Sequence, residues 1–152
     1  MQLTSSAFKQ EEAIPKKYSG EGVDVSPPLQ WQGAPQGTKS FALICDDPDA
    51  PSGTWTHWVL YNLPGDSTAL EEIVAKAETL PNGTRQGKNS WPKNNIGYQG
   101  PMPPSGKHRY FFKIYALDNV LDLAAGANKA QLEKAMKGHV LAHGELMGTY
   151  ER

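Results

Sequence analysis

The chain has 152 residues and carries 15 Lys and Arg against 16 Asp and Glu, a formal net charge of −1 at pH 7. This length suits one domain with its own core, so we interpret residues 1–152 as a single domain, and the balanced charge excludes bulk attraction to nucleic acid or anionic membranes. Cys45 is the only cysteine, so no internal disulfide can form. No apolar run is long enough to cross a bilayer, and the N-terminus has no signal-peptide pattern. The sequence therefore predicts a cytoplasmic protein without disulfides or a transmembrane segment.

Glycine and proline, at 15 and 12 residues, are spread along the chain, which favours short strands joined by turns over a helical bundle. The apolar run Ser40–Asp46 has the length of a buried strand. In Thr54–Leu63 the alternation predicts a second strand whose odd-numbered residues share one face. In Arg109–Leu117 the even-numbered residues are apolar and predict a third. A closing strand over Glu145–Glu151 and short edge strands around Leu3–Ser6 and Val23–Val25 complete the predicted set.

Two short helices are expected at the periphery of this mostly β fold. The clearer one has Asn128 as N-cap and Gln131 as its capping-box partner, and it ends near Gly138. The weaker one begins near Ser67 and covers Leu70–Ala75. The expected fold class is therefore mostly β, with one or two short helices.

The residues best suited to chemistry stand at predicted strand ends. Asp47 precedes Pro48 and Asp49 follows it, so the backbone there is stiff and the carboxylates are aimed. His57 and His108 each lie at the start of a β-like run, which is how a mostly apolar pocket acquires oriented polar groups. Such groups can hold an anion, coordinate a metal or move a proton, and the residues alone leave all three open. The plain alternative is a turn followed by core histidines.

Other reactive residues point less clearly to a site. His139 and His143 lie four apart, which fits a metal site on a helix, but the glycines that bracket them favour a capping or loop role. Cys45 has no basic neighbour in sequence and is expected to be an inert, buried thiol. The absence of a nucleophile elbow and of a His-Glu-x-x-His helix weakens a hydrolase interpretation.

Two motifs carry a resemblance to a known family. The first is Asp47-Pro48-Asp49-Ala50-Pro51 followed by Trp55 and His57, and the second runs from Gly100 to Tyr110 as Gly-Pro-x-Pro-Pro-x-Gly-x-His-Arg-Tyr. The sequence resembles the phosphatidylethanolamine-binding protein family, also called Raf-kinase-inhibitor-like proteins. Residues 14–18, 26–31, 80–83 and 138–142 extend the resemblance over nearly the whole chain. The short turn after Pro51 and the end at Arg152 are similar to its compact bacterial and archaeal branch.

The resemblance implies an antiparallel β-sandwich with Greek-key connections and a small pocket at one end. In the family that pocket takes phosphate, acetate, cacodylate or the phosphoryl head group of phosphatidylethanolamine, without a metal or another cofactor. It also implies a cis peptide at Ala50–Pro51. The stretch Ser90–Asn95 departs from the family's shorter turn, which affects the pocket rim. Carried over to this chain, the pocket residues are Asp47, His57, Gly100, Pro101, His108 and Tyr110, with Asp49 and Trp55 supporting them.

The function implied is that of a non-enzymatic binding or regulatory protein whose ligand is a small anion or a phosphorylated molecule. Family members are associated with inhibition of kinases or serine proteases, so a protein partner of that kind is expected. Two histidines and a carboxylate also fit a metal triad. The alternative function is therefore a metal-assisted phosphoester hydrolase that uses Asp47, His57 and His108.

Assembly is a separate expectation. Compact members of the family are often homodimers, and Trp91 and Tyr98 give the segment Thr79–Gly106 more aromatic surface than a solvated loop needs. This predicts that the segment packs on a partner subunit near the pocket mouth. The alternative is that Trp91 folds back on its own domain.

Overall fold

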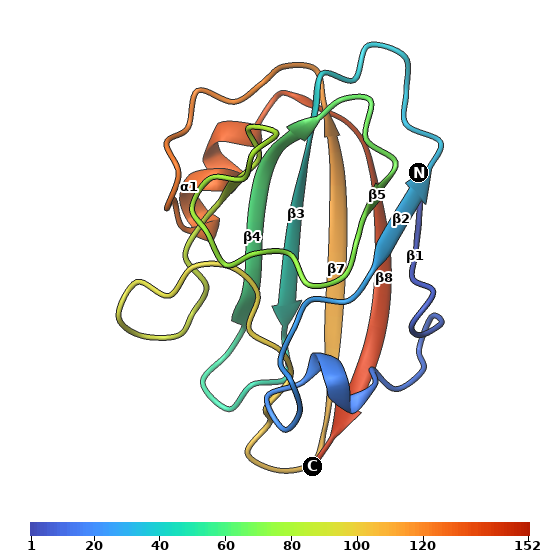
Figure 1. Ribbon diagram of the computed structural model, residues 1–152, viewed down its shortest axis with the longest axis vertical. Helices are drawn as coiled ribbons and strands as arrows, with labels where there is room; N and C mark the ends of the chain where they lie inside the picture. The colour runs from blue at the N-terminus through green and yellow to red at the C-terminus, as the bar shows by residue number, and fades with distance from the viewer.

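Eight strands form two antiparallel sheets in the computed structural model, which describes residues 1–152 (Figure 1). The larger sheet has the order β6-β4-β3-β7-β8 and the smaller one the order β1-β2-β5. The mostly β class is thus confirmed, while the Greek-key connections of a sandwich stay a prediction. The elements are β1 (Gln2–Thr4), a 3₁₀ turn (Lys16–Tyr18), β2 (Leu29–Gln32), β3 (Ser40–Asp47), β4 (Trp55–Pro64), β5 (Ala69–Leu70), β6 (Arg85–Gln86), β7 (Lys107–Leu117), α1 (Lys129–Met136) and β8 (Val140–Glu151).

Strand β3 is buried along its whole length because both faces of the large sheet are covered near its centre. The small sheet covers one face, and α1 packs against the other (Figure 1). The even-numbered residues of β7 face the small sheet, as the alternation predicts. The core between the sheets includes Leu3, Leu29, Trp31 and Leu70 from the small sheet and Phe41, Leu43, Trp58, Leu60, Tyr110, Phe112 and Ile114 from the large one.

A β-bulge in β4 changes which of its side chains share a face. The pairing of β3 with β4 slips between Cys45 and Asp46, and His57 is the residue of β4 left without a partner. A bulge shifts the alternation by one. Val59 therefore packs on the α1 side, whereas the ring of His57 contacts Tyr110 on the other side, with 5.1 Å between centroids. The prediction that all odd-numbered residues of this strand share one face is wrong for this reason.

Two predicted elements are absent, and three short strands, β2, β5 and β6, were not predicted. Residue Leu70 lies in β5, where it pairs with Leu29 of β2, so the helix expected over Leu70–Ala75 is wrong. The segment Val23–Val25 is not a strand either, and Val23 lies in a turn and is exposed. Strand β2 was missed, although its buried and exposed residues alternate.

The helix α1 begins as the capping pattern predicts. The Asn128 side chain accepts a hydrogen bond from the Gln131 backbone N–H at 2.8 Å, and the Gln131 side chain accepts one from the Asn128 backbone N–H at 2.9 Å. Leu132 and Met136 are buried against the large sheet. The Lys129 ammonium also reaches the buried carboxylate of Asp46 in β3 at 2.7 Å. Capping and this ion pair together fix the helix on the face away from the small sheet.

Candidate functional site

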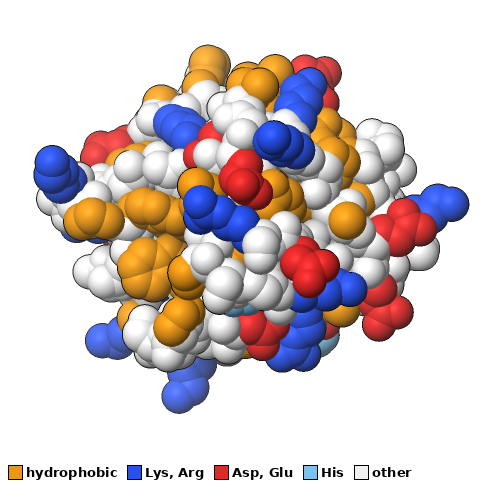
Figure 2. All heavy atoms as spheres, turned by 90° about the horizontal axis from the view of Figure 1, so that it is seen from below, with side chains coloured by type: hydrophobic (Ala, Val, Ile, Leu, Met, Phe, Trp, Pro, Cys, Tyr) orange, Lys and Arg blue, Asp and Glu red, His pale blue; other side chains and the backbone are white.

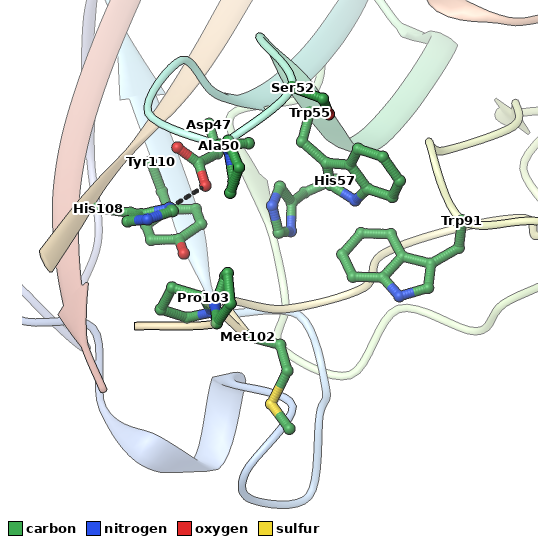
Figure 3. Close-up of a pocket in the computed structure, with 12 residues that line it drawn as sticks. Asp47, Ala50, Ser52, Trp55, His57, Trp91, Met102, Pro103, His108 and Tyr110 are labelled. Atoms are coloured by element: carbon green, nitrogen blue, oxygen red, sulfur yellow. Dashed lines mark hydrogen bonds and ion pairs between the residues drawn. The ribbon is translucent and has the colours of Figure 1, made fainter. Parts of the chain in front are cut away.

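A cavity of about 290 Å³ opens at the end of the large sheet where β3 finishes and β4 and β7 begin. This end is the lower one in Figure 1, and Figure 3 shows the cavity's side chains. Three segments that are distant in sequence meet there because β3 lies between β4 and β7. The cavity is lined by Asp47, Ala50, Pro51, Ser52, Trp55, His57, Trp91, Met102, Pro103, Pro104, His108 and Tyr110.

Asp47 and His108 form a buried pair on one side of the cavity (Figure 3). The Nδ1 of His108 lies 2.7 Å from Oδ2 of Asp47, and the two side chains are only 9% and 5% exposed. The other carboxylate oxygen of Asp47 accepts a hydrogen bond from the Asp49 backbone N–H at 2.7 Å. Both oxygens of Asp47 are thus used within the protein. The carboxylate holds the His108 ring in one orientation and leaves Nε2 for another partner.

Asp49 stands beside the cavity and ties its turn to β7. Its carboxylate accepts hydrogen bonds from the Arg109 backbone N–H at 2.9 Å, from Nε at 2.9 Å and from Nη2 at 2.8 Å. The Arg109 guanidinium holds the pKa of Asp49 at about 2, well below the usual range of a carboxyl. Arg109 is therefore neutralised by Asp49, and neither residue lines the cavity.

His57 is fixed by a backbone carbonyl. Its Nδ1 lies 2.6 Å from the Gln99 oxygen, and because a carbonyl can only accept, Nδ1 carries the proton. Burial lowers the pKa of His57, and the Gln99 bond and the nearby carboxylates oppose this only in part. The ring is therefore neutral at neutral pH, and Nε2 is an acceptor. The ring meets Trp91 and Tyr110 edge to face, with centroids 4.9 Å and 5.1 Å away.

Tyr110 contributes a hydroxyl that has no hydrogen-bond partner in the protein. The side chain is 1% exposed, and it lines the cavity beside His108 (Figure 3). Burial and the Asp47 charge raise its pKa, so the hydroxyl keeps its proton and can donate. A buried hydroxyl without a partner costs about 1–3 kcal/mol. Few buried polar groups in folded proteins lack a partner, and this hydroxyl is free to donate to a ligand in the cavity.

Two tryptophans form an apolar wall at the mouth of the cavity. Trp55 and Trp91 meet edge to face with centroids 5.5 Å apart, and Met102 extends the apolar lining. Figure 2 views this end of the molecule and shows hydrophobic side chains gathered on one side of it. Trp91 belongs to the stretch Ser90–Asn95, which is attached to β4 by the Thr56 backbone N–H donating to Oγ of Ser90 at 2.8 Å. The sequence identified this stretch as unusual but not Trp91 as a cavity residue.

Comparison with known proteins agrees with this architecture. The family model described as phosphatidylethanolamine-binding protein matches residues 4–151. A UPF0098 protein of Methanothermobacter thermautotrophicus is 55% identical over 152 residues, which cover 100% of this chain and 99% of that protein. The chain belongs to the phosphatidylethanolamine-binding protein family.

Two crystal structures share the fold. The phosphatidylethanolamine-binding protein homologue CT736 from Chlamydia trachomatis aligns with a TM-score of 0.89 at 46% identity, covering 99% of this chain and 97% of that chain. Escherichia coli YBCL, described as a new member of the mammalian family, aligns with a TM-score of 0.89 at 33% identity, covering 99% of this chain and 98% of that chain. The family resemblance noted in the sequence is therefore confirmed.

Three family-based expectations need correction in this chain. The structure places Gly100 and Pro101 outside the cavity lining. The Gly100 N–H donates to the Asp24 carboxylate at 2.7 Å, and a Cβ on Gly100 would lie 2.1 Å from the Tyr18 carbonyl oxygen, so the glycine serves close backbone packing. The cis peptide expected before Pro51 is also wrong, because every peptide bond is trans.

The remaining reactive residues lie elsewhere. No group of three or more His, Cys, Asp and Glu side chains is arranged to hold a metal ion. His139 pairs with Asp118 at 2.8 Å on the surface, and His143 packs near Tyr115. Cys45 is buried in the core, and burial raises the pKa of its thiol well above the usual range. No helix in the structure has the length and apolar character needed to cross a membrane.

Proposed function

We propose that this protein binds small anions in the cavity, taking a phosphoryl or carboxylate head group, and that it acts as a binding or regulatory protein rather than an enzyme. The observation that carries the proposal is the buried Tyr110 hydroxyl, which faces the cavity without a partner in the protein. Family membership suggests a ligand-binding fold. The proposal places the protein in the cytoplasm, which suits its single, buried thiol.

The polar groups of the cavity suit an oxyanion. The Tyr110 hydroxyl donates, and His108 donates through Nε2 when its ring carries both protons. Asp47 contacts Nδ1 of His108 at 2.7 Å, so the ring is oriented with Nε2 toward the cavity. The wall of Trp55, Trp91 and Met102 suits a ligand whose anionic head continues into an apolar body.

The alternative, a metal-assisted phosphoester hydrolase, has less support from the geometry. It would use Asp47, His57 and His108 as a metal triad. However, both oxygens of Asp47 already have partners in the protein, and no group of three His, Cys, Asp or Glu side chains is arranged to hold a metal ion. The protein partner implied by the family, a kinase or a serine protease, would meet the cavity mouth, where Met102 is exposed.

Calorimetric titration of the purified protein with inorganic phosphate tests this proposal. We expect saturable binding, and the Tyr110→Phe variant should weaken it by about tenfold because one hydrogen bond to a charged ligand is lost. Tyr115→Phe, on the same strand but outside the cavity, is the matched control and should bind like the parent protein. A parent protein without measurable phosphate binding would contradict the proposal. Turnover of a phosphoester on addition of a divalent metal would favour the hydrolase instead.

A further inference from the structure

The orientation of the His57 ring is fixed by the neighbouring backbone of Gln99. The backbone of Gln99 contacts His57 twice. The Gln99 N–H donates to the His57 carbonyl at 3.0 Å, and the His57 Nδ1–H donates to the Gln99 carbonyl at 2.6 Å. Because these bonds hold both the strand and the ring, the ring cannot turn its N–H toward the cavity. Its Nε2 has no partner in the protein and presents a lone pair there.

The surroundings of His57 keep it in this neutral state. Burial of the ring is the largest effect on its pKa and lowers it. The rings of Trp91 and Tyr110 pack against the imidazole, and no Lys or Arg lines the cavity. The titratable groups that face or surround it are Asp46 and Asp47 from β3, Tyr110 and His108 from β7, and Asp24 from the loop before β2.

We infer that the cavity selects anions that carry a proton of their own, specifically the monoanion of phosphate or of a phosphomonoester, and that Nε2 of His57 accepts the hydrogen bond of that proton. This inference rests on the proposed anion binding and adds a specificity-determining residue to it. Tyr110 and His108 donate to the unprotonated oxygens of the ligand. His57 lies between Asp47 and Trp91 in the cavity and accepts the hydrogen bond from the ligand's O–H (Figure 3). A fully ionised ligand would instead place a negative oxygen against the Nε2 lone pair.

Two anions without a proton separate this inference from simple charge attraction. Sulfate matches phosphate in shape, and dimethyl phosphate matches its monoanion in charge. At about pH 6, below the second ionisation of inorganic phosphate, the monoanion dominates, and burial disfavours a second proton on His57. In calorimetric titrations we expect sulfate and dimethyl phosphate each to bind at least about tenfold more weakly than phosphate, because each leaves Nε2 of His57 without a donor.

The His57→Gln variant tests whether His57 causes the preference for phosphate over sulfate. In His57→Gln the side-chain amide can donate, so the preference for phosphate over sulfate should narrow to within about threefold. His143→Gln, on β8 away from the cavity, should keep the full preference. If either proton-free anion binds the parent protein as tightly as phosphate does, the inference is overturned while the proposed anion binding stands. If phosphate itself does not bind, both are overturned.

Discussion

At the scale of single residues, Asp47 has two opposite effects on a bound anion. Its charge repels the ligand, but its carboxylate orients the His108 ring through the contact with Nδ1. The pair is buried, so both effects act with little screening by solvent. Asp47 contacts the ring directly, with Oδ2 2.7 Å from Nδ1 of His108, and its other oxygen is taken by the Asp49 backbone N–H. We therefore expect the orienting effect to dominate.

This gives a prediction whose sign discriminates between the two effects. Asp47→Asn should weaken phosphate binding, and His108→Ala should weaken it by about 1.5–3 kcal/mol, the contribution of a charge-assisted hydrogen bond. Calorimetry on both variants measures this. The exposed pair of His139 and Asp118 provides a control, since Asp118→Asn removes a similar contact away from the cavity and should leave binding unchanged. Tighter binding in Asp47→Asn would show that the carboxylate acts only as a like charge.

At the scale of secondary-structure elements, α1 is stabilised at its first turn by Asn128. Asn128→Ala removes the capping side chain and should lower the free energy of unfolding by about 1 kcal/mol. Urea denaturation followed by circular dichroism measures the loss. Lys134→Ala changes an exposed position of the same helix and should stay within about 0.5 kcal/mol of the parent. Equal stability of the Asn128 and Lys134 variants would mean that the cap is not needed to hold the helix.

The long strands and α1 could be predicted because each has a local pattern of sufficient length. Short elements lack one: Leu70 contributes to a two-residue strand whose only support is its pairing with Leu29. The bulge at His57 also escaped prediction, because alternation is read from one strand and a bulge arises from the pairing of two. Elements held by their own sequence are thus predictable, and those held by a neighbour are not.

The candidate site follows the same division. The sequence motifs correctly bring Asp47, His57, His108 and Tyr110 to one cavity. They could not reveal the proton position on His57, because that depends on a carbonyl 42 residues away. Gly100 was assigned to the lining from the family, but in this chain its N–H is used by an aspartate 76 residues away.

At the scale of the whole molecule, the aromatic residues that suggested a partner subunit pack within their own chain. Trp91 contacts Trp55 and His57, and the Tyr98 hydroxyl donates to the Tyr18 carbonyl at 2.6 Å. The homodimer stays a prediction, but Trp91 no longer motivates it. We expect the parent protein and Trp91→Ala to sediment alike at high micromolar concentration. A dimer in the parent that dissociates in the variant would restore the predicted interface, and a parent that sediments as a monomer would exclude the homodimer.

The contact between His108 and Asp47 joins residues 61 positions apart in the chain. Closing so large a loop is slow compared with forming a local hairpin, and it occurs only when β7 has docked beside β3. The cavity is therefore completed only after these two strands have paired. An anion that binds only the completed cavity cannot speed folding, but it slows unfolding. Bound phosphate should therefore prolong the lifetime of the native state without changing the folding rate.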